Sequence, residues 1–168
     1  AVFGDAPSMY FTSENSTFGT SLLTDGGPAA LRRIGAPFDS FSLDDLENPD
    51  LPLEQYRLVI FLNAFKIPEK RKTFIEEKVK SKGRSLLWLY APGYITAEEF
   101  SLASMHAITD IHIKLRASSS SEIRLQNKDI LSGIPDGIKF GFKKEISPLF
   151  KIDDPEAEIL GRYTDGDE

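Results

Sequence analysis

A short apolar run near the middle of the chain ends abruptly in a proline–glycine turn. Residues 86–90 read Leu-Leu-Trp-Leu-Tyr, and Ala91-Pro92-Gly93 follow directly. A continuous apolar run bounded by turn residues is typical of a buried strand. In open α/β sheets, ligands bind and nucleophiles stand at the carboxyl ends of such strands. No nucleophile follows this run, so the sequence predicts an enzyme-like fold without an evident catalytic residue.

A second buried run precedes the first, and a helix separates the two. Residues 58–62 read Leu-Val-Ile-Phe-Leu, a pattern found in central strands of parallel sheets. Residues 68–82 begin with proline, carry Glu69 in the first turn and lysines in the last, and stop at Gly83. These segments predict one β-α-β unit with a right-handed crossover. The buried stripe of this helix is expected to contain Phe74, Ile75, Lys78 and Val79.

The remaining segments predict an α/β chain whose character changes after residue 110. A first strand near the N-terminus, a short helix at 28–35 and an alternating strand at 38–43 would complete the layers. Thr96 followed by Glu99 carries a capping signal and predicts a helix over 96–105. We expect a mostly parallel sheet flanked by helices, with extra short β strands in the last third. Those strands are predicted at 111–115, 123–125, 138–142, 149–152 and 157–163.

Composition excludes several classes of function. The chain has 168 residues, a formal net charge of −6 and no cysteine. The negative charge opposes nucleic-acid binding, and the lack of cysteine excludes disulfides, thiolate metal sites and a cysteine nucleophile. No apolar run approaches the length of a transmembrane helix, so no membrane partner is expected. The glycines form no phosphate-binding pattern, and we expect no cofactor.

Four segments together resemble a known family. They are Arg-Ile-Gly-Ala-Pro-Phe-Asp at 33–39, Ser-Leu-Asp-Asp-Leu at 42–46, Phe-Leu-Asn-Ala-Phe at 61–65 and Leu-Trp-Leu-Tyr-Ala-Pro-Gly-Tyr at 87–94. The combination resembles the amidotransferase-like domains attached to bacterial glycoside hydrolases, of which the beta-galactosidase trimerisation domain is the best-known relative. The resemblance implies a flavodoxin-like three-layer sandwich, similar in fold to class I glutamine amidotransferases. It also implies a single domain over residues 1–168 that belongs to a larger protein.

The chemistry of the resembled enzymes is missing from this sequence. Class I amidotransferases place a cysteine in a Gly-x-Cys-x-Gly turn and use a later His-x-Glu. Here Ala91 falls at the nucleophile's position, with Pro92 as the alternative if the alignment slips by one residue, and no histidine follows His112. A hydrolytic triad of this type is therefore excluded. We assign no catalytic residue and expect the isolated domain not to be catalytic.

One set of residues is a candidate ligand cleft at the carboxyl ends of the two buried strands. Aromatic rings beside an amide and free backbone groups suit a sugar or another neutral ligand. The alternative is that the aromatic rings complete the packing under the loops. The candidate residues are Asn63, Phe65, Tyr90, Ala91, Pro92, Gly93 and Tyr94.

Acidic residues and histidines give weaker signals. Asp39, Asp44 and Asp45 could hold a metal or act in acid–base chemistry. An aspartate directly after a strand more often caps the next helix, which is the interpretation we prefer. His106 and His112 have no third ligand at metal spacing, so we assign no metal site.

Two functions follow from these observations. The first is a non-catalytic accessory or assembly domain of a carbohydrate-processing protein similar to glycoside hydrolases. Its partners would be other domains of the same parent protein or identical subunits. The alternative is a small-molecule binding module, with a sugar bound in the cleft at the carboxyl ends of the central strands. A third and weaker hypothesis is an enzyme that uses Asp39, Asp44 and Asp45.

Overall fold

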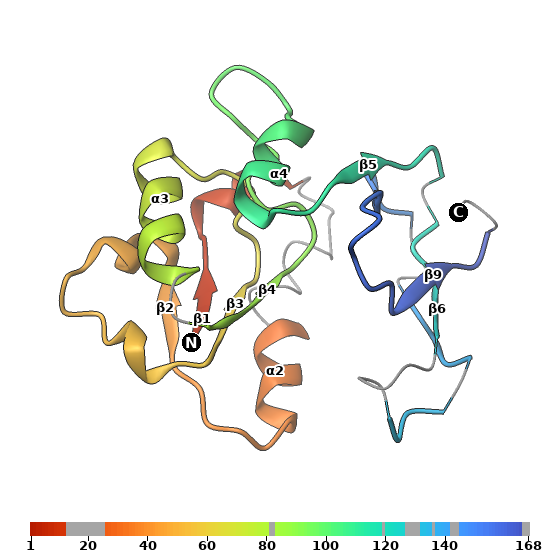
Figure 1. The fold of residues 1–168 in the computed structure, drawn as a ribbon, viewed down its shortest axis with the longest axis horizontal. Coiled ribbons are helices and arrows are strands. Elements are labelled where there is room, and N and C mark those ends of the chain that lie inside the picture. The colour runs from red at the N-terminus through yellow and green to blue at the C-terminus, as the bar shows by residue number, and fades with distance from the viewer. Residues whose placement is uncertain are drawn as a thin grey trace. The chain divides into compact units, whose positions relative to one another are not determined.

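A computed structural model of the chain describes residues 1–12, 26–80, 83–118, 120–126, 132–135, 137–141 and 145–165 (Figure 1). The chain divides into two compact units, Ala1–Asp110 and Ile111–Glu168. The expectation of one domain over residues 1–168 stays a prediction.

The first unit is built on a four-stranded parallel sheet. Its strands are β1 (Val2–Gly4), β2 (Ser40–Ser42), β3 (Leu58–Phe61) and β4 (Ser85–Trp88), in the order β2-β1-β3-β4 (Figure 1). Every neighbouring pair is parallel. The order is that of the first four strands of a flavodoxin-like sheet, and it reverses direction between β1 and β3. The predicted α/β class with a mostly parallel sheet is confirmed.

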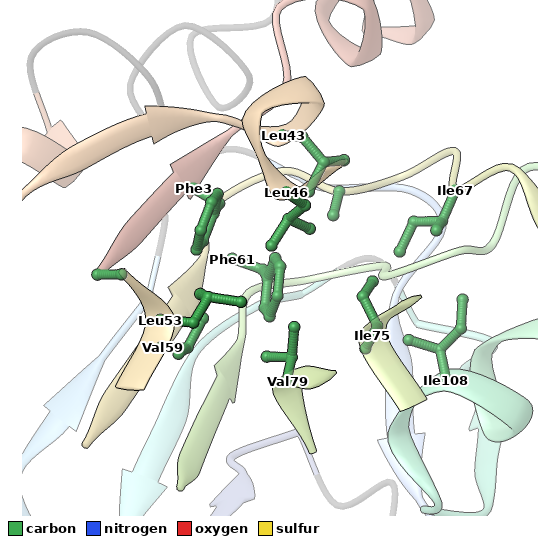
Figure 2. Close-up of a cluster of buried hydrophobic side chains, with 12 residues drawn as sticks. Phe3, Leu43, Leu46, Leu53, Val59, Phe61, Ile67, Ile75, Val79 and Ile108 are labelled. Atoms are coloured by element: carbon green, nitrogen blue, oxygen red, sulfur yellow. The ribbon is translucent and has the colours of Figure 1, made fainter. Parts of the chain in front are cut away.

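Helices cover both faces of this sheet, which gives three layers. On one face, Phe3, Val59 and Phe61 pack with buried side chains of the helical segments (Figure 2). Those segments are the 3₁₀ helices η2 (Leu43–Glu47) and η3 (Leu53–Gln55), the π-helical turn η4 (Ile75–Val79) and α4 (Leu102–Thr109). On the other face, Ile60 and its neighbours pack with Leu31 of α2 (Gly26–Arg33). No helix in the described ranges is long and apolar enough to cross a membrane.

The continuous apolar run at 58–62 explains this arrangement. Side chains alternate along a strand, so Val59 and Phe61 face one layer while Ile60 and Leu62 face the other. All four are buried, as a central parallel strand requires. The Phe61 ring stacks on Trp88, with ring centroids 4.0 Å apart. Each such aromatic or aliphatic side chain contributes about 1.5–3 kcal/mol by leaving water.

Two predicted helices have different outcomes. The helix at 68–82 is confirmed as α3 (Glu69–Phe74) and η4, with Ile75 and Val79 buried, while residues 81–82 lie outside the described ranges. The helix at 96–105 is wrong at its start, because α4 begins at Leu102. Ser101 is its N-cap, and the Ser101 side chain accepts a hydrogen bond from the Ser104 amide.

The Thr96 signal closes a turn instead of a helix. The Thr96 hydroxyl accepts hydrogen bonds from the backbone amides of Glu98 and Glu99, at 3.2 and 3.0 Å. The Thr96 amide in turn donates to the Glu99 carbonyl at 2.9 Å. Threonine side chains compete with helix formation through local bonds of this kind.

The second unit contains the short strands predicted for the last third. Strand β5 (Ile113–Leu115) pairs antiparallel with β8 (Phe150–Ile152). Strand β6 (Ile123–Leu125) lies between β7 (Lys139–Phe140) and β9 (Gly161–Tyr163), again antiparallel. Each predicted segment contains a strand. The strand at 123–125 is confirmed with its bounds, the other four are shorter than predicted, and residue 142 of the segment 138–142 lies outside the described residues.

Arg116 links several parts of the second unit. Its side chain is buried, and its guanidinium carbon lies 3.5 Å from the centroid of the Tyr163 ring. The guanidinium donates hydrogen bonds to the Ser120 carbonyl at 2.8 Å and to the Asp165 carboxylate at 2.6 Å. A planar donor that pairs with a carboxylate and stacks on a ring is the geometry that arginine favours.

Candidate functional site

The carboxyl ends of β1 and β3 meet where the strand order reverses. This is the position at which open α/β sheets bind ligands. Asp5 directly follows β1, and Asn63 lies two residues beyond the end of β3. Both side chains are buried, as is that of Ser8 in the 3₁₀ helix η1 (Pro7–Phe11). The polar groups at the switch point are therefore enclosed, and their partners decide what they can do.

The Asn63 side chain joins the two strand ends. Its Oδ1 accepts a hydrogen bond from the Asp5 amide, and its Nδ2 donates to the Asp5 carbonyl, each at 2.7 Å. The side chain is 1% exposed. Both functional groups of the amide are thus used by the protein backbone.

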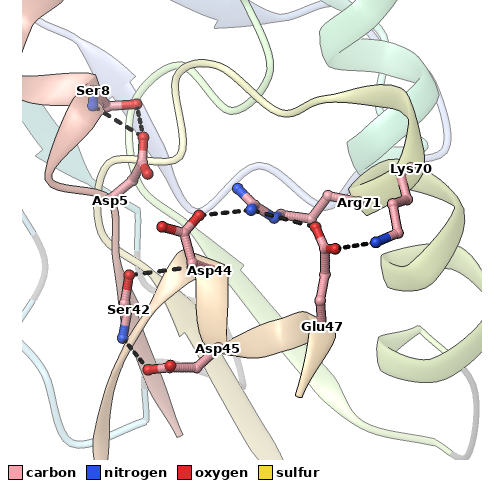
Figure 3. A network of polar contacts seen from close by, with 8 residues as sticks. All are labelled: Asp5, Ser8, Ser42, Asp44, Asp45, Glu47, Lys70 and Arg71. Atoms are coloured by element: carbon pink, nitrogen blue, oxygen red, sulfur yellow. Dashed lines mark hydrogen bonds and ion pairs between the residues drawn. The ribbon is translucent and has the colours of Figure 1, made fainter. Parts of the chain in front are cut away.

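Asp5 and Ser8 form the second half of this buried cluster. The Asp5 Oδ2 accepts hydrogen bonds from the Ser8 amide, at 3.0 Å, and from the Ser8 hydroxyl (Figure 3). The Ser8 hydroxyl also accepts one from the Phe65 amide at 3.2 Å. Within the described part of the chain, Asp5 forms no ion pair with a basic side chain. The buried carboxylate is stabilised by N–H and O–H donors, as a buried charge requires.

The turn after β4 carries its backbone strain at Tyr90. Tyr90 has φ 70°, in the left-handed region that non-glycine residues seldom adopt. Strained turns of this kind hold the nucleophile in enzymes with a strand–turn–helix elbow. The sequence placed Ala91 at that position, so the strained residue lies one place earlier than predicted. The Tyr90 ring packs edge-on against Phe65, with centroids 5.6 Å apart.

Long-range hydrogen bonds fix this turn. The Leu89 amide donates to the Phe61 carbonyl at 3.0 Å, the last bond before the chain leaves the sheet. Backbone hydrogen bonds to the segment after β3 then begin again. The Gly93 amide donates to the Ala64 carbonyl at 2.8 Å, and the Ile95 amide donates to the Phe65 carbonyl at 2.9 Å. The segment between these bonds bulges away from the ladder, which explains the strain at Tyr90.

Gly93 cannot carry a side chain without disturbing α4. Its φ is 64°, and a Cβ at this position would lie 2.1 Å from the Cδ1 atom of Ile108. The turn is therefore packed directly on α4. Ala91 and Pro92 are buried beside it.

The structure brings the candidate cleft residues to one edge of the sheet, as predicted. Tyr90 and Tyr94 are half-buried, while the other five are buried, and the polar side chain among those five is committed to the backbone. A ligand role for these residues stays a prediction. The buried five are Asn63, Phe65, Ala91, Pro92 and Gly93.

Ser42 is the N-cap of η2, and Asp45 completes its capping box. The Asp45 carboxylate accepts a hydrogen bond from the Ser42 amide at 2.8 Å, and the Ser42 hydroxyl accepts one from the Asp44 amide at 3.3 Å (Figure 3). Asp39 accepts a hydrogen bond from the Tyr56 hydroxyl at 2.7 Å. The capping interpretation therefore holds for Asp45, whereas Asp44 pairs with Arg71 and Asp39 precedes β2. In the described ranges, no three His, Asp or Glu side chains are arranged to hold a metal ion.

An ion-pair network ties the 3₁₀ helix η2 to α3. Arg71, whose side chain is 11% exposed, lies 2.6 Å from the Asp44 carboxylate and 3.4 Å from that of Glu47 (Figure 3). Lys70 pairs with Glu47 as well. The hydrogen bond from Lys70 is the main cause that lowers the pKa of Glu47. Ion pairs with exposed carboxylates contribute little to stability, so the main consequence of this network is to hold η2 against α3.

The histidines do not form one site within a compact unit. His106 lies in α4 of the first unit, whereas His112 precedes β5 in the second.

Sequence reasoning identified Asn63 but did not connect it with Asp5 and Ser8. Asp5 and Asn63 are 58 residues apart, and no local pattern joins them. The one available signal was that each follows a buried strand, which places both at the same sheet edge.

Comparisons with known proteins find a likeness of shape. No family model matches the chain, and no curated protein matches its sequence. The structure is similar to a crystal structure of beta-galactosidase from Bifidobacterium adolescentis, with 15% sequence identity and a TM-score of 0.49. The match covers 99% of this chain and 77% of that chain.

Proposed function

We propose that this chain is a non-catalytic accessory domain of a carbohydrate-processing protein, one that acts by assembly with identical subunits or with other domains of its parent. The resemblance of residues 33–95 to the amidotransferase-like domains of glycoside hydrolases suggests the class. One observation carries the non-catalytic part. The strained residue of the turn after β4 is Tyr90, and Ala91, Pro92 and Gly93 follow it, so the turn carries no serine, threonine or cysteine nucleophile.

The polar groups beside this turn support the same conclusion. An activated nucleophile needs a base within hydrogen-bond reach, and the base needs a group that orients it. Asp5, Ser8 and Asn63 are the buried polar side chains at the switch point, and they bond to one another and to the backbone. Chemistry that used Asn63 would require breaking its two hydrogen bonds to the Asp5 backbone, which join the segments after β1 and β3.

Exposed leucines on one face of the sheet support the assembly role. Leu87 lies opposite Ile60 in the ladder, on the face that Leu31 of α2 covers in part. Leu58 and Leu87 are each 44% exposed. The strand β4 that carries Leu87 is one of the two edge strands of the described sheet. Apolar side chains on an edge strand favour pairing with another chain or domain.

Two measurements test the proposal. The chain is assayed for hydrolysis of nitrophenyl glycosides and of glutamine, and we expect no turnover. Turnover that Asp5→Asn or Tyr90→Phe abolishes would contradict the non-catalytic role. Self-association is followed by sedimentation for Leu87→Glu and for Leu115→Glu, a matched leucine in the second unit that is 47% exposed. Assembly weakened by the first change and not by the second supports the leucine face as the interface.

A sugar-binding function is favoured by a separate observation, the aromatic side chains on the outer side of the same sheet edge. Tyr94 stacks there on Phe100, which is largely exposed.

A further inference from the structure

The loop after Gly93 holds its backbone in a defined hairpin. Ile95 and Phe100 form an antiparallel bridge, and the Ser101 amide donates to the Tyr94 carbonyl at 2.8 Å. The Thr96 hydroxyl closes the tip by accepting from the Glu98 and Glu99 amides. Ile95 also bridges Lys66, the residue after Phe65, so the hairpin is anchored to the segment that follows β3. The loop is therefore ordered by backbone bonds on both sides.

This hairpin presents an aromatic ring to solvent. Phe100 is 69% exposed. Its ring lies parallel to that of Tyr94, with centroids 5.4 Å apart and an angle of 11° between the planes. Tyr94 covers one face of the Phe100 ring, and the high exposure leaves the opposite face open. A large apolar side chain that is exposed on an ordered hairpin indicates a binding surface more strongly than one exposed on a flexible loop.

We infer that the stacked pair Tyr94–Phe100 is a platform for an uncharged pyranose ring of a saccharide. The face of an aromatic ring carries negative charge from its quadrupole, and it attracts positively polarised groups. The C–H bonds on one face of a pyranose ring are such groups, and that face is flat and apolar. A flat ring with one open face is complementary to it. The inference rests on the proposed carbohydrate-processing function, which it deepens by naming the ligand class.

The side chains around the platform can form hydrogen bonds with the hydroxyl groups at the edge of a sugar ring. Glu98 and Glu99, both exposed, lie on the turn next to Phe100. Their carboxylates can accept hydrogen bonds from sugar hydroxyls, and hydrogen bonds to ionised acceptors are among the stronger ones. The same two charges, in a chain of net charge −6, repel anionic saccharides and nucleic acids. The platform therefore favours a neutral saccharide.

Size argues against a protein as the occupant of this platform. Each partner in a stable protein complex buries about 800 Å². Two stacked rings on a short hairpin offer far less, whereas a single sugar ring covers about the area of one aromatic ring. The platform also lies outside the buried part of the predicted cleft, and of the seven cleft candidates it uses Tyr94 alone.

The test is a titration of the 168-residue chain, labelled with ¹⁵N, with two neutral trisaccharides, cellotriose and β-1,4-galactotriose. We expect amide shifts at Tyr94, Thr96 and Phe100 with at least one of them. Phe100→Ala should weaken binding about tenfold, which corresponds to about 1.4 kcal/mol, and Phe100→Tyr should preserve it. The matched control is Phe140→Ala, a phenylalanine of the second unit that is 51% exposed, which should leave binding unchanged.

Three results would overturn the inference: no shift with either trisaccharide at millimolar concentration, binding that Phe100→Ala retains, or equal binding of the anionic trigalacturonate. We expect the thermal midpoint of Phe100→Ala to equal that of the wild type, because an exposed ring contributes little to stability. An unchanged midpoint would show that a loss of binding does not result from a loss of folding. A failed titration leaves the accessory-domain proposal in place, since that proposal is tested by turnover and assembly. Turnover by the chain would refute the accessory role without changing the Phe100 result.

Discussion

The Asn63 side chain forms two hydrogen bonds with the backbone of Asp5, one accepted from its amide and one donated to its carbonyl, each 2.7 Å long. The pair closes the sheet edge between β1 and β3, where this class of fold usually opens to a ligand. Ser8 extends the closure to the amide of Phe65. The edge is thus filled by its own polar groups, and the exposed aromatic surface lies farther out, at Phe100.

Replacing Asn63 with alanine should destabilise the first unit strongly. The change leaves the Asp5 amide and carbonyl buried without their partners, and each unsatisfied group costs about 1–3 kcal/mol. We expect a loss of about 2–4 kcal/mol in the free energy of unfolding, measured by urea titration. Asn48→Ala is the control, because Asn48 is exposed and its side chain accepts a hydrogen bond from the Asp50 amide two residues away. Equal stability of the two variants would contradict a structural role for Asn63.

Gly93→Ala tests the close approach between the turn and α4. The new methyl would meet Cδ1 of Ile108 at 2.1 Å and would also sit on a left-handed backbone. We expect a loss of about 2–4 kcal/mol, since overpacking costs about 1–3 kcal/mol and the backbone about 1. Gly35→Ala isolates the backbone contribution, because Gly35 has φ 72° and no atom within 4 Å of its would-be Cβ.

A second substitution separates packing from backbone strain at Gly93. Ile108→Val removes the Cδ1 atom that the new methyl would strike. The double variant should therefore lose less stability than the sum of the two single changes, a positive coupling measurable in a double-mutant cycle. Strict additivity would mean that the clash is relieved by movement elsewhere.

The sequence predicted where strands and helices occur better than it predicted where each one begins and ends. Residues 58–62 form a central strand that is buried from Val59 onward, as such a run favours. The run 86–90 was also predicted as a buried strand, and this is wrong, because β4 lies at an edge of the described sheet and Leu87 is 44% exposed. The start of α4 was missed because Thr96 meets the same local capping rule in a turn as in a helix. The hydrogen bond from Ser101 to Tyr94 then decides the path of the chain, and it is not visible in the local pattern.

The sequence places the candidate residues at the sheet edge but does not show which of them bond to other parts of the protein. Asn63 follows a buried strand, which correctly placed it at the carboxyl edge. Its partner, Asp5, lies 58 residues away, so the sequence could not show that the amide is used internally. The strain at Tyr90 likewise depends on bonds between Gly93 and Ala64 across the ladder. Whether a polar side chain at this edge bonds to the protein or stays available to a ligand therefore depends on its long-range partners more than on its residue type.

Asp165 should make the second unit sensitive to acid. The hydrogen bond from Arg116, followed by that from Ser118, lowers the pKa of the Asp165 carboxyl to about 2. The group has an ordinary value of 3.8 in the unfolded chain, so its stabilisation is complete above that pH. It is lost as the pH falls from about 4 towards 2. Thermal midpoints of the wild type over this range should fall more steeply than those of Asp165→Asn.

The control for this pH effect is Asp153→Asn. Asp153 pairs with Lys114 at 2.6 Å, but both side chains are about half exposed. Removing such a surface pair should change the midpoint little at any pH. A wild-type acid response that persists in Asp165→Asn would assign it to another carboxylate.

The single tryptophan of the chain provides a probe of the central layer. Trp88 stacks on Phe61 with an angle of 12° between the rings, and Phe61 stacks in turn on Phe3. Phe61→Leu keeps an apolar side chain but removes the ring contact, so we expect a loss of about 1–2 kcal/mol and a shift in Trp88 emission. Phe41→Leu also removes a ring that stacks on Phe3, at 5.5 Å, but belongs to β2 on the far side of β1. It should destabilise the unit without shifting the emission, and equal spectral changes in both variants would mean that Trp88 reports global loosening instead of the local stack.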